Sequence, residues 1–414
     1  MKKLFAFILG GALTATFAFA DVSVGVSGRG AARVFDFSGY NNDYDNDFEK
    51  TAETYGKDGS HSSPATTFGE FLNDFNFSAS TEDNKLGFNL DLEYVVDSDG
   101  GFGDISLPDQ AKVWWQPTDW FLGQIGMIEV DDLRGTIGDW GNGRRDIGSL
   151  GEDDIFDRFY PQAGVALSFY PVEGLFVGAT FDAFGPVIYD NNREKDDSAI
   201  WAENFYKSLN IGFGYTIDEK FQIKAAYFGA KDPRDGDKDE LKDDDFNGKL
   251  ELGFNWNINE NNLLEVGVKV PLWSDNDKRN EENGYLFQAV AGIAGENDNL
   301  SYKGHAVYRS INDTDKDGDL SYYPLFGVDA GIEYALDNFA LGATVNYGGA
   351  FNNLHDKNIA INTFGAEVYI KKDVAADCFL FAGVADTLTV TDVEDTVKNT
   401  TNRFYIPLGI EYAF

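Results

Sequence analysis

The sequence predicts an all-β protein, a transmembrane antiparallel up-and-down β-barrel of about 18 strands without a plug domain. Three observations support this fold class. Apolar and polar residues alternate with a period of two in many segments, and short polar turns alternate with long acidic connections. The last segment of the chain also alternates, up to an aromatic terminal residue.

The first 20 residues are expected to be a secretory signal peptide that is cleaved after export through the Sec pathway. Lys2 and Lys3 give a positive start, an apolar run extends from Leu4 to Phe17, and Ala18-Phe19-Ala20 is a small-x-small cleavage site. A membrane anchor is the alternative, but the run is short and a strand-like pattern follows it directly. We therefore divide the chain into a signal peptide, 1–20, and a barrel domain, 21–414.

Composition excludes several other classes of protein. Without Lys2 and Lys3 the chain has 31 basic and 70 acidic side chains, a formal charge of −39, which argues against a nucleic-acid partner. An aromatic content of 15% argues against a disordered acidic chain. The single cysteine, Cys378, excludes a disulfide framework. After residue 20, no apolar run is long enough for a membrane helix.

The period of two is clear in individual segments. In 249–258 the even-numbered residues are apolar and the odd-numbered residues are polar or glycine. Segments 86–96 and 264–272 repeat the pattern, which is typical of strands with one apolar and one polar face. A soluble β-sandwich would also alternate, but it does not explain consecutive hairpins whose loops are long on one side only.

The connections set the strand count. Sixteen or twenty strands also fit, because 109–117 and 22–37 are the weakest segments. An even count places both termini on the periplasmic side, with the short turns. The long connections are 38–67, 97–108, 131–159, 186–203, 231–245, 274–284, 312–320, 349–358 and 389–401. The strands are expected to begin near residues 22, 68, 85, 109, 120, 161, 175, 204, 221, 246, 263, 285, 300, 321, 338, 359, 377 and 402.

The C-terminal segment adds a resemblance to a known family. Apolar residues alternate from Phe404 through Leu408 and Tyr412 to Phe414. This segment resembles the terminal strand of bacterial outer-membrane β-barrels, and the remaining architecture is similar to that of porins. The resemblance implies insertion into outer-membrane lipid by the barrel-assembly machinery, and porins are commonly homotrimers. Expected interfacial girdle residues are Trp114, Trp115, Trp120, Phe121, Tyr170, Trp273, Tyr322, Tyr323 and Tyr412.

A barrel of this size can enclose an aqueous channel, so the sequence predicts passive diffusion of small hydrophilic solutes or ions. The connection 131–159 is the third long loop, the position of the constriction loop in general porins. An outward surface loop is an equal alternative. The candidate constriction residues are Arg134, Asp139, Arg144, Arg145, Asp146 and Arg158.

The polar strand faces predict a lumen lining of mixed charge. The acidic excess of the whole chain would concentrate cations near the mouths and make the channel weakly cation-selective. The candidate lining residues are Arg29, Arg33, Asp91, Glu93, Lys112, Asp182, Lys224, Lys249, Glu251, Glu265, Lys269, Lys303, Arg309, Asp329, Glu333 and Glu367.

The connection 312–320 resembles the front half of a calcium loop. Asp313, Asp315 and Asp317 are spaced like ligands one, three and five, and Gly318 follows for the turn. Pro324 stands where the loop needs glutamate, which excludes a complete EF-hand. A solvated acidic loop is the alternative, and no other cofactor is expected.

Other functions have weaker support. His61 and His355 lie in expected loops and His305 on the polar face of a strand, without a nucleophile or metal motif nearby, so no enzyme is predicted. A surface adhesin or structural barrel acting through loop 38–67 is an alternative function. A hydrophobic-substrate transporter is a second alternative, but that family has an N-terminal hatch, and the first expected strand starts near residue 22.

Overall fold

Nineteen β-strands make up nearly all of the regular structure in the computed structural model. It describes residues 21–44, 59–97, 104–105, 110–135, 137, 164–182, 209–229, 247–273, 285–314, 320–354, 357–393 and 397–413. The strands are β1 (Asp21–Tyr44), β2 (Gly59–Ser80), β3 (Leu86–Asp97), β4 (Asp104–Ile105), β5 (Gln110–Thr118), β6 (Phe121–Met127), β7 (Gly164–Phe169), β8 (Leu175–Asp182), β9 (Leu209–Ile217), β10 (Phe221–Phe228), β11 (Asn247–Asn259), β12 (Asn262–Trp273), β13 (Tyr285–Asn297), β14 (Leu300–Thr314), β15 (Leu320–Leu336), β16 (Phe339–Leu354), β17 (Lys357–Ala375), β18 (Cys378–Val393) and β19 (Val397–Ala413).

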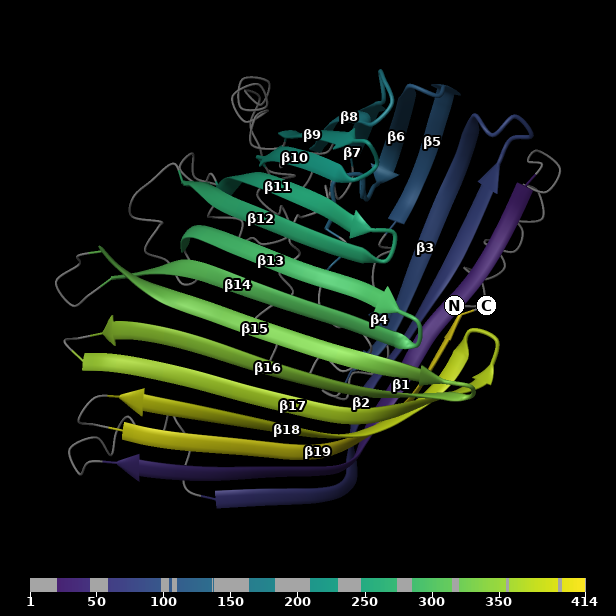
Figure 1. Ribbon diagram of the computed structural model, residues 1–414. Helices are drawn as coiled ribbons and strands as arrows, with labels where there is room; N and C mark the ends of the chain where they lie inside the picture. Colours follow the sequence, from purple (N-terminus) through teal and green to yellow (C-terminus); the bar gives the residue numbers. More distant parts are fainter. Residues whose placement is uncertain are drawn as a thin grey trace, which may run out of the picture.

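The strands form one closed antiparallel barrel (Figure 1). Neighbours in sequence pair with each other, and β1 pairs with both β2 and β19, which closes the sheet. The two-residue β4 adds to β3, which pairs directly with β5, so 18 strands make the wall. The predicted fold class and the predicted 18 strands are confirmed. In the part of the chain that the structure describes, no helix is long and apolar enough to cross a membrane.

The two faces of the wall differ as the alternation predicts. Glu251 is 1% exposed and Lys269 is 3% exposed, whereas Leu252 on the opposite face is 63% exposed. In a closed barrel the face that buries charges is the inside, so polar side chains point inward and apolar ones outward. The register carries this parity from strand to strand around the barrel, because paired residues share a face.

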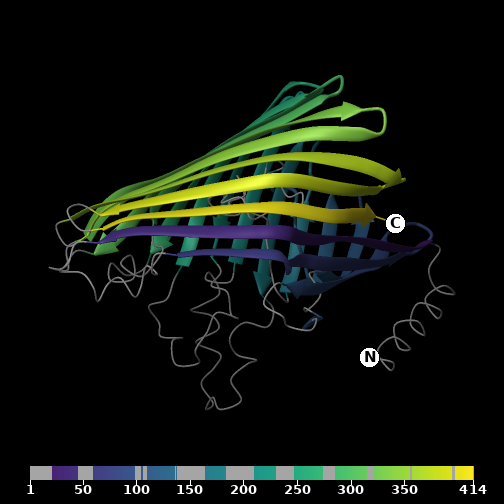
Figure 2. The same ribbon diagram turned by 90° about the horizontal axis from the view of Figure 1, so that it is seen from below.

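Within the described residues, the strands of the barrel wall differ in length (Figures 1 and 2). Strands β5 to β10, the short wall, have between 6 and 9 residues each. Strands β14 to β19, the long wall, have between 15 and 19 residues, and β1 and β2 beside them have 24 and 22.

Several predicted long loops were too long, all beside the long wall. Connection 38–67 is largely strand, since β1 and β2 remain paired out to Tyr40 and Gly59. His61, expected in that loop, therefore lies in β2 opposite Ser38. Connections 312–320, 349–358 and 389–401 are shortened in the same way. Cross-strand pairing within each hairpin continues through these segments, so backbone hydrogen bonding extends the ladder through residues that favour turns in isolation.

The short polar turns lie where the sequence places them. Their backbones use left-handed conformations at Asn84, Asp218, Glu219, Asp298 and Asp377. Asn and Asp tolerate this region better than most residues, which explains their recurrence at these turns.

Candidate functional site

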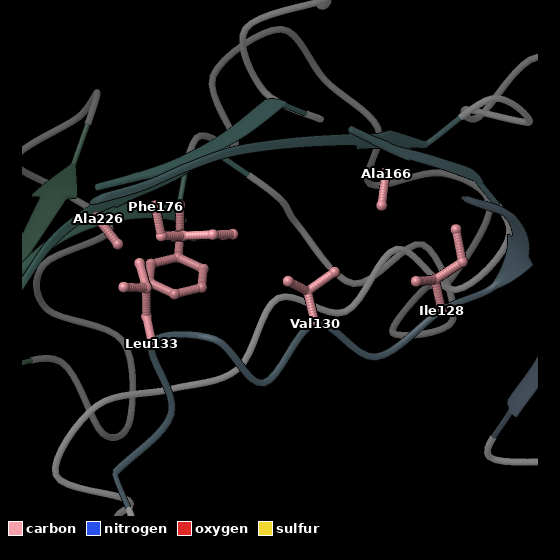
Figure 3. Close-up of a cluster of buried hydrophobic side chains, with 7 residues drawn as sticks. Ile128, Val130, Leu133, Ala166, Phe176 and Ala226 are labelled. Atoms are coloured by element: carbon pink, nitrogen blue, oxygen red, sulfur yellow. The ribbon is translucent and has the colours of Figure 1, made fainter. Parts of the chain in front are cut away.

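Residues 128–135 and 137, the inner segment, leave β6 and lie against the inside of the barrel (Figure 3). Ile128, Val130 and Leu133 are buried and belong to one apolar cluster with Phe176 of β8 and Ala226 of β10. Because these apolar side chains are buried against the barrel wall, they direct this otherwise acidic part of the chain toward the barrel interior.

A glycine makes room for the inner segment. A Cβ at Gly214 in β9 would lie 2.6 Å from Leu133 Cδ2, far inside van der Waals contact. Gly214 pairs with Phe176 on β8 and with Lys224 on β10, so the three residues form the floor under Leu133. The absence of a side chain at Gly214 therefore lets the segment approach the wall.

Two charged side chains hold the backbone of the inner segment. Lys224 Nζ donates to the carbonyl oxygens of Leu133 at 3.1 Å and Arg134 at 3.2 Å. Glu265 Oε2 on β12 accepts the backbone N–H of Ile137 at 2.8 Å. Both side chains are almost completely buried, so these bonds act where water does not compete strongly.

A third contact ties the segment to the short-turn end of β7. The Tyr170 hydroxyl donates to Asp132 Oδ1 at 2.8 Å. Desolvation raises the pKa of Asp132, and the hydrogen bond from Tyr170 opposes that rise. Desolvation and the nearby Asp132 also raise the pKa of Tyr170, which keeps the phenol protonated as the donor.

The inner segment turns once on its way across the barrel. The Arg134 N–H donates to the carbonyl oxygen of Asp131 at 3.0 Å, so residues 131–134 form a turn. After the turn, Lys224 of β10 holds Leu133 and Arg134, and Glu265 of β12 holds Ile137. The segment therefore passes from β6 through the inside of the barrel and occupies part of the lumen.

At its far end, Ile137 rests on the opposite part of the barrel. It is 1% exposed and clusters with Val290 of β13 and Val307 of β14, with Leu263 and Ala294 packed against them. The inner segment includes or precedes the predicted constriction residues in sequence. Of these, Arg134 lies within the inner segment, and Asp139, Arg144, Arg145, Asp146 and Arg158 lie outside the described residues.

The register places all the candidate lining residues on the inner face. For Arg29, Arg33, Glu93 and Asp182 this placement rests on backbone pairing alone. The others are Asp91, Lys112, Lys224, Lys249, Glu251, Glu265, Lys269, Lys303, Arg309, Asp329, Glu333 and Glu367.

The inner face pairs opposite charges both within a strand and across strands. Glu251 Oε1 lies 3.0 Å from Lys249 Nζ and 3.9 Å from Lys269 Nζ. Farther along the wall, Glu333 Oε2 lies 2.8 Å from Lys371 Nζ and accepts the Tyr369 hydroxyl at 2.9 Å. The first cluster therefore combines one carboxylate with two ammonium groups and the second combines one with one, so both signs of charge occur in the lining.

Sequence reasoning missed two groups of lining residues. Lys371 and Tyr369 share their parity with Glu367 on the same strand, so extending the alternation by two steps would have found them. The apolar residues Ile128, Val130, Leu133 and Ile137 stand out within an acidic connection and signalled burial.

Two of the predicted girdle residues whose side chains the structure describes lie on the inner side of the barrel. Trp114 shares its face with Lys112 and stands over Gly87, where an added Cβ would meet its ring at 2.5 Å. Tyr170 points to Asp132 of the inner segment. Each stands next to another aromatic residue, so the sequence does not fix which of the two faces outward. Trp115 and Trp120 are exposed as expected, at 53% and 52%.

The calcium candidates are only partly described. Asp313 lies in β14 opposite Ser321 of β15, within a strand and not in a loop. Asp315 and Asp317 fall outside the described residues. Among the residues that are described, no group of three His, Cys, Asp or Glu side chains could hold a metal ion.

Comparisons with known proteins gave likenesses of structure only. No family model and no curated protein matches the sequence. OccAB4 of Acinetobacter baumannii has a TM-score of 0.46 at 11% identity, covering 96% of this chain and 99% of its own. OpdL of Pseudomonas aeruginosa has 0.45 at 11%, covering 95% and 99%, and the outer membrane channel DcaP of A. baumannii has 0.44 at 14%, covering 95% and 98%.

Proposed function

We propose that the protein is an integral outer-membrane channel for passive diffusion of small hydrophilic solutes and ions. The observation that supports this most is the closed wall of 18 strands with charged residues inside and large apolar residues outside. Lipid requires such an outer surface, and a barrel of this strand number leaves an aqueous interior unless it is filled.

The inner segment is the proposed start of a constriction. It occupies the lumen side of the short wall, held by Lys224 and Glu265, and Arg134 lies within it.

Weak cation selectivity is part of the proposal. The inner clusters around Glu251 and Glu333 pair both signs, so the wall itself supplies little preference. The chain as a whole has a net charge of −37, and this excess would raise the cation concentration at the mouths.

The proposed channel function also implies where the protein is located and how it is assembled. Export through the Sec pathway, insertion by the barrel-assembly machinery, periplasmic termini and a homotrimeric assembly are proposed with it. The short turns would then face the periplasm.

Liposome swelling with sugars of graded size tests the channel. The refolded protein is expected to admit small sugars and to exclude larger ones, whereas heat-denatured protein in parallel liposomes admits none. Reversal potentials under a KCl gradient should show a modest cation preference. A refolded barrel that admits no sugar and passes no current would support the adhesin or structural alternative instead, and a clear anion preference would contradict the proposed selectivity.

A further inference from the structure

The outer face of β17 changes from apolar to polar along the strand. Its even-numbered residues form this face, since they pair with the outer residues of β16 and β18. Nearest the short turn the outer residues are exposed and apolar: Ala366, Val368 and Ile370. Toward the other end of the strand they are Asn358, Ala360 and Asn362, and Phe364 lies between the two groups.

The outer face of β19 repeats this order. Strands β17, β18 and β19 lie side by side (Figure 1). Apolar residues come first on β19, Phe404 follows, and polar residues lie beyond it. Phe364 packs on Tyr347 of β16, and these two residues and Phe404 are called the upper aromatic row. The polar residues of β19 beyond this row are Asn402, Thr400 and Lys398.

The apolar part of β17 matches the height of a lipid core. Phe364 and the exposed Lys372 on the same face are eight positions apart, which is about 26 Å along a strand. A tilt of about 40° reduces this to about 20 Å of membrane thickness, close to the apolar band of about 25 Å in outer-membrane barrels. A hydrocarbon layer of that height would end near Phe364.

A carboxylate on the outer face agrees with this limit. Asp386 of β18 is exposed and pairs in register with Phe404. It accepts a hydrogen bond from Asn402 Nδ2 at 2.9 Å. Charged groups on the lipid face are destabilising at the middle of the bilayer and tolerated near its interfaces. Asp386 therefore fits an interface at the level of the upper aromatic row.

The strands continue well beyond this level. From Phe364 to Lys357, β17 has seven further residues, about 23 Å along the strand and about 18 Å after the same tilt. Phospholipid headgroups add only about 5–8 Å to each side of the hydrocarbon core. Most of this projecting part would therefore stand clear of phospholipid headgroups, in water or in a thicker headgroup layer.

The outer face of the projecting part, the upper outer face, has little charge on a strongly acidic chain. The net charge of the whole chain is −37. On the described strands β17 to β19, this face has one carboxylate, Asp392, which pairs in register with Lys398. Its other members are Asn358, Ala360, Asn362, Val390, Thr400 and Asn402. Such a surface does not repel anionic groups, and its amides and hydroxyl can bond to polar ones.

We propose that the upper outer face contacts the headgroup layer of an anionic glycolipid, whose sugar hydroxyls and phosphates extend beyond the hydrocarbon. Asn362 and Thr400 offer hydrogen bonds to sugar hydroxyls, and Lys398 offers a positive charge to phosphate. The contact rests on the proposed outer-membrane channel with its short turns in the periplasm, and it adds a class of lipid to that function.

Nitroxide labels on single cysteines of β17, in a Cys378→Ala background, test the contact. In phospholipid vesicles the label of Val368→Cys should collide with oxygen dissolved in the hydrocarbon. The labels of Asn358→Cys and Asn362→Cys should collide with an aqueous nickel chelate. In vesicles that also contain lipopolysaccharide, the nickel accessibility of the second and third labels should fall several-fold, and that of the first should not change.

Asn362→Glu tests the effect of charge, with Thr363→Glu as the matched control. Glutamate keeps an acceptor for the Tyr347 hydroxyl, which donates to Asn362 Oδ1 at 2.7 Å. Thr363 is the next residue but lies on the inner face, beside Thr389. With the label at position 358, Asn362→Glu should weaken the lipopolysaccharide effect several-fold, because the carboxylate repels phosphate, and Thr363→Glu should retain it. KCl conductance reports whether each variant has folded, and if Asn362→Glu fails to insert, the label scan decides.

Several outcomes would overturn the glycolipid contact while leaving the channel intact. Oxygen collisions at position 358 or 362 would place the hydrocarbon above Phe364. Nickel accessibility that does not respond to lipopolysaccharide would leave the face in water. Labels that are already shielded from both probes in phospholipid alone would assign the face to another copy of the chain. Equal effects of the two glutamate variants would contradict the role of charge. A label at position 368 that meets the nickel chelate and not oxygen would instead contradict the proposed membrane channel.

Discussion

Lys224 Nζ lies 3.1 Å from the carbonyl oxygen of Leu133, a residue 91 positions earlier in the chain. The same ammonium group also reaches the carbonyl oxygen of Arg134. One buried lysine thus ties the chain leaving β6 to the inner face of β10, four strands away, and sets the course of the inner segment.

Replacing Lys224 with methionine should free the inner segment without preventing barrel closure. The substitution keeps a long apolar stem but removes the donors to Leu133 and Arg134, at a cost of about 1.5–3 kcal/mol for charged hydrogen bonds. Single-channel recordings should show larger current noise and altered conductance. Lys220→Met, in an exposed turn, is the control and should behave as wild type. Identical recordings for both variants would contradict the role given to Lys224.

Removing the acceptor at Glu265 should loosen the far end of the inner segment. Glu265→Leu leaves the buried N–H of Ile137 without its acceptor, at a cost of about 1–3 kcal/mol. Glu265→Gln retains an acceptor oxygen and should be milder. Amide hydrogen exchange at Ile137 measures the effect directly. Protection should fall most in the leucine variant, and unchanged protection there would mean that other contacts hold the segment.

The barrel could be predicted from the sequence because the alternation that indicates each strand is visible within a short segment. Alternation in 249–258 or 264–272 needs only neighbouring residues, and the register then follows from which face is apolar. The limits of the loops beside the long wall could not be predicted in the same way. Tyr40 and Gly59 are strand residues because they pair with each other across β1 and β2, a contact that no local pattern records.

The course of the inner segment could not be predicted from the sequence for the same reason. Its course depends on Lys224 and Glu265, which are 91 and 128 positions from their partners in sequence. The connection 131–159 was accordingly consistent with an inward or an outward path from sequence alone. The parity of Lys224, Glu265 and His305 on their strands could be predicted, whereas their partners depend on barrel closure.

Gly126 in β6 should not tolerate a side chain. Its φ is +131°, a region that residues with a Cβ rarely adopt, and an added Cβ would lie 2.1 Å from the carbonyl oxygen of Ala111. Gly126→Ala should therefore destabilise the barrel by about 2–4 kcal/mol. Gly123→Ala on the same strand is the control, because a Cβ there would meet its nearest atom at 3.5 Å. Urea unfolding in detergent micelles compares the two, and equal midpoints would contradict the strain assigned to Gly126.

Adjacent residues of β16 test which face meets lipid. Val345 is 58% exposed on the outer face, and Thr344 pairs with Glu367 on the inner face. Val345→Lys should destabilise the inserted barrel by about 2–4 kcal/mol if it lies near the middle of the bilayer, because lipid cannot solvate the ammonium group. Thr344→Lys places the same charge in the lumen, so the barrel should remain as stable as wild type while its cation preference falls. Unfolding from lipid vesicles and reversal potentials measure both effects. Equal losses of stability in the two variants would contradict the assignment of inner and outer faces on which the channel proposal depends.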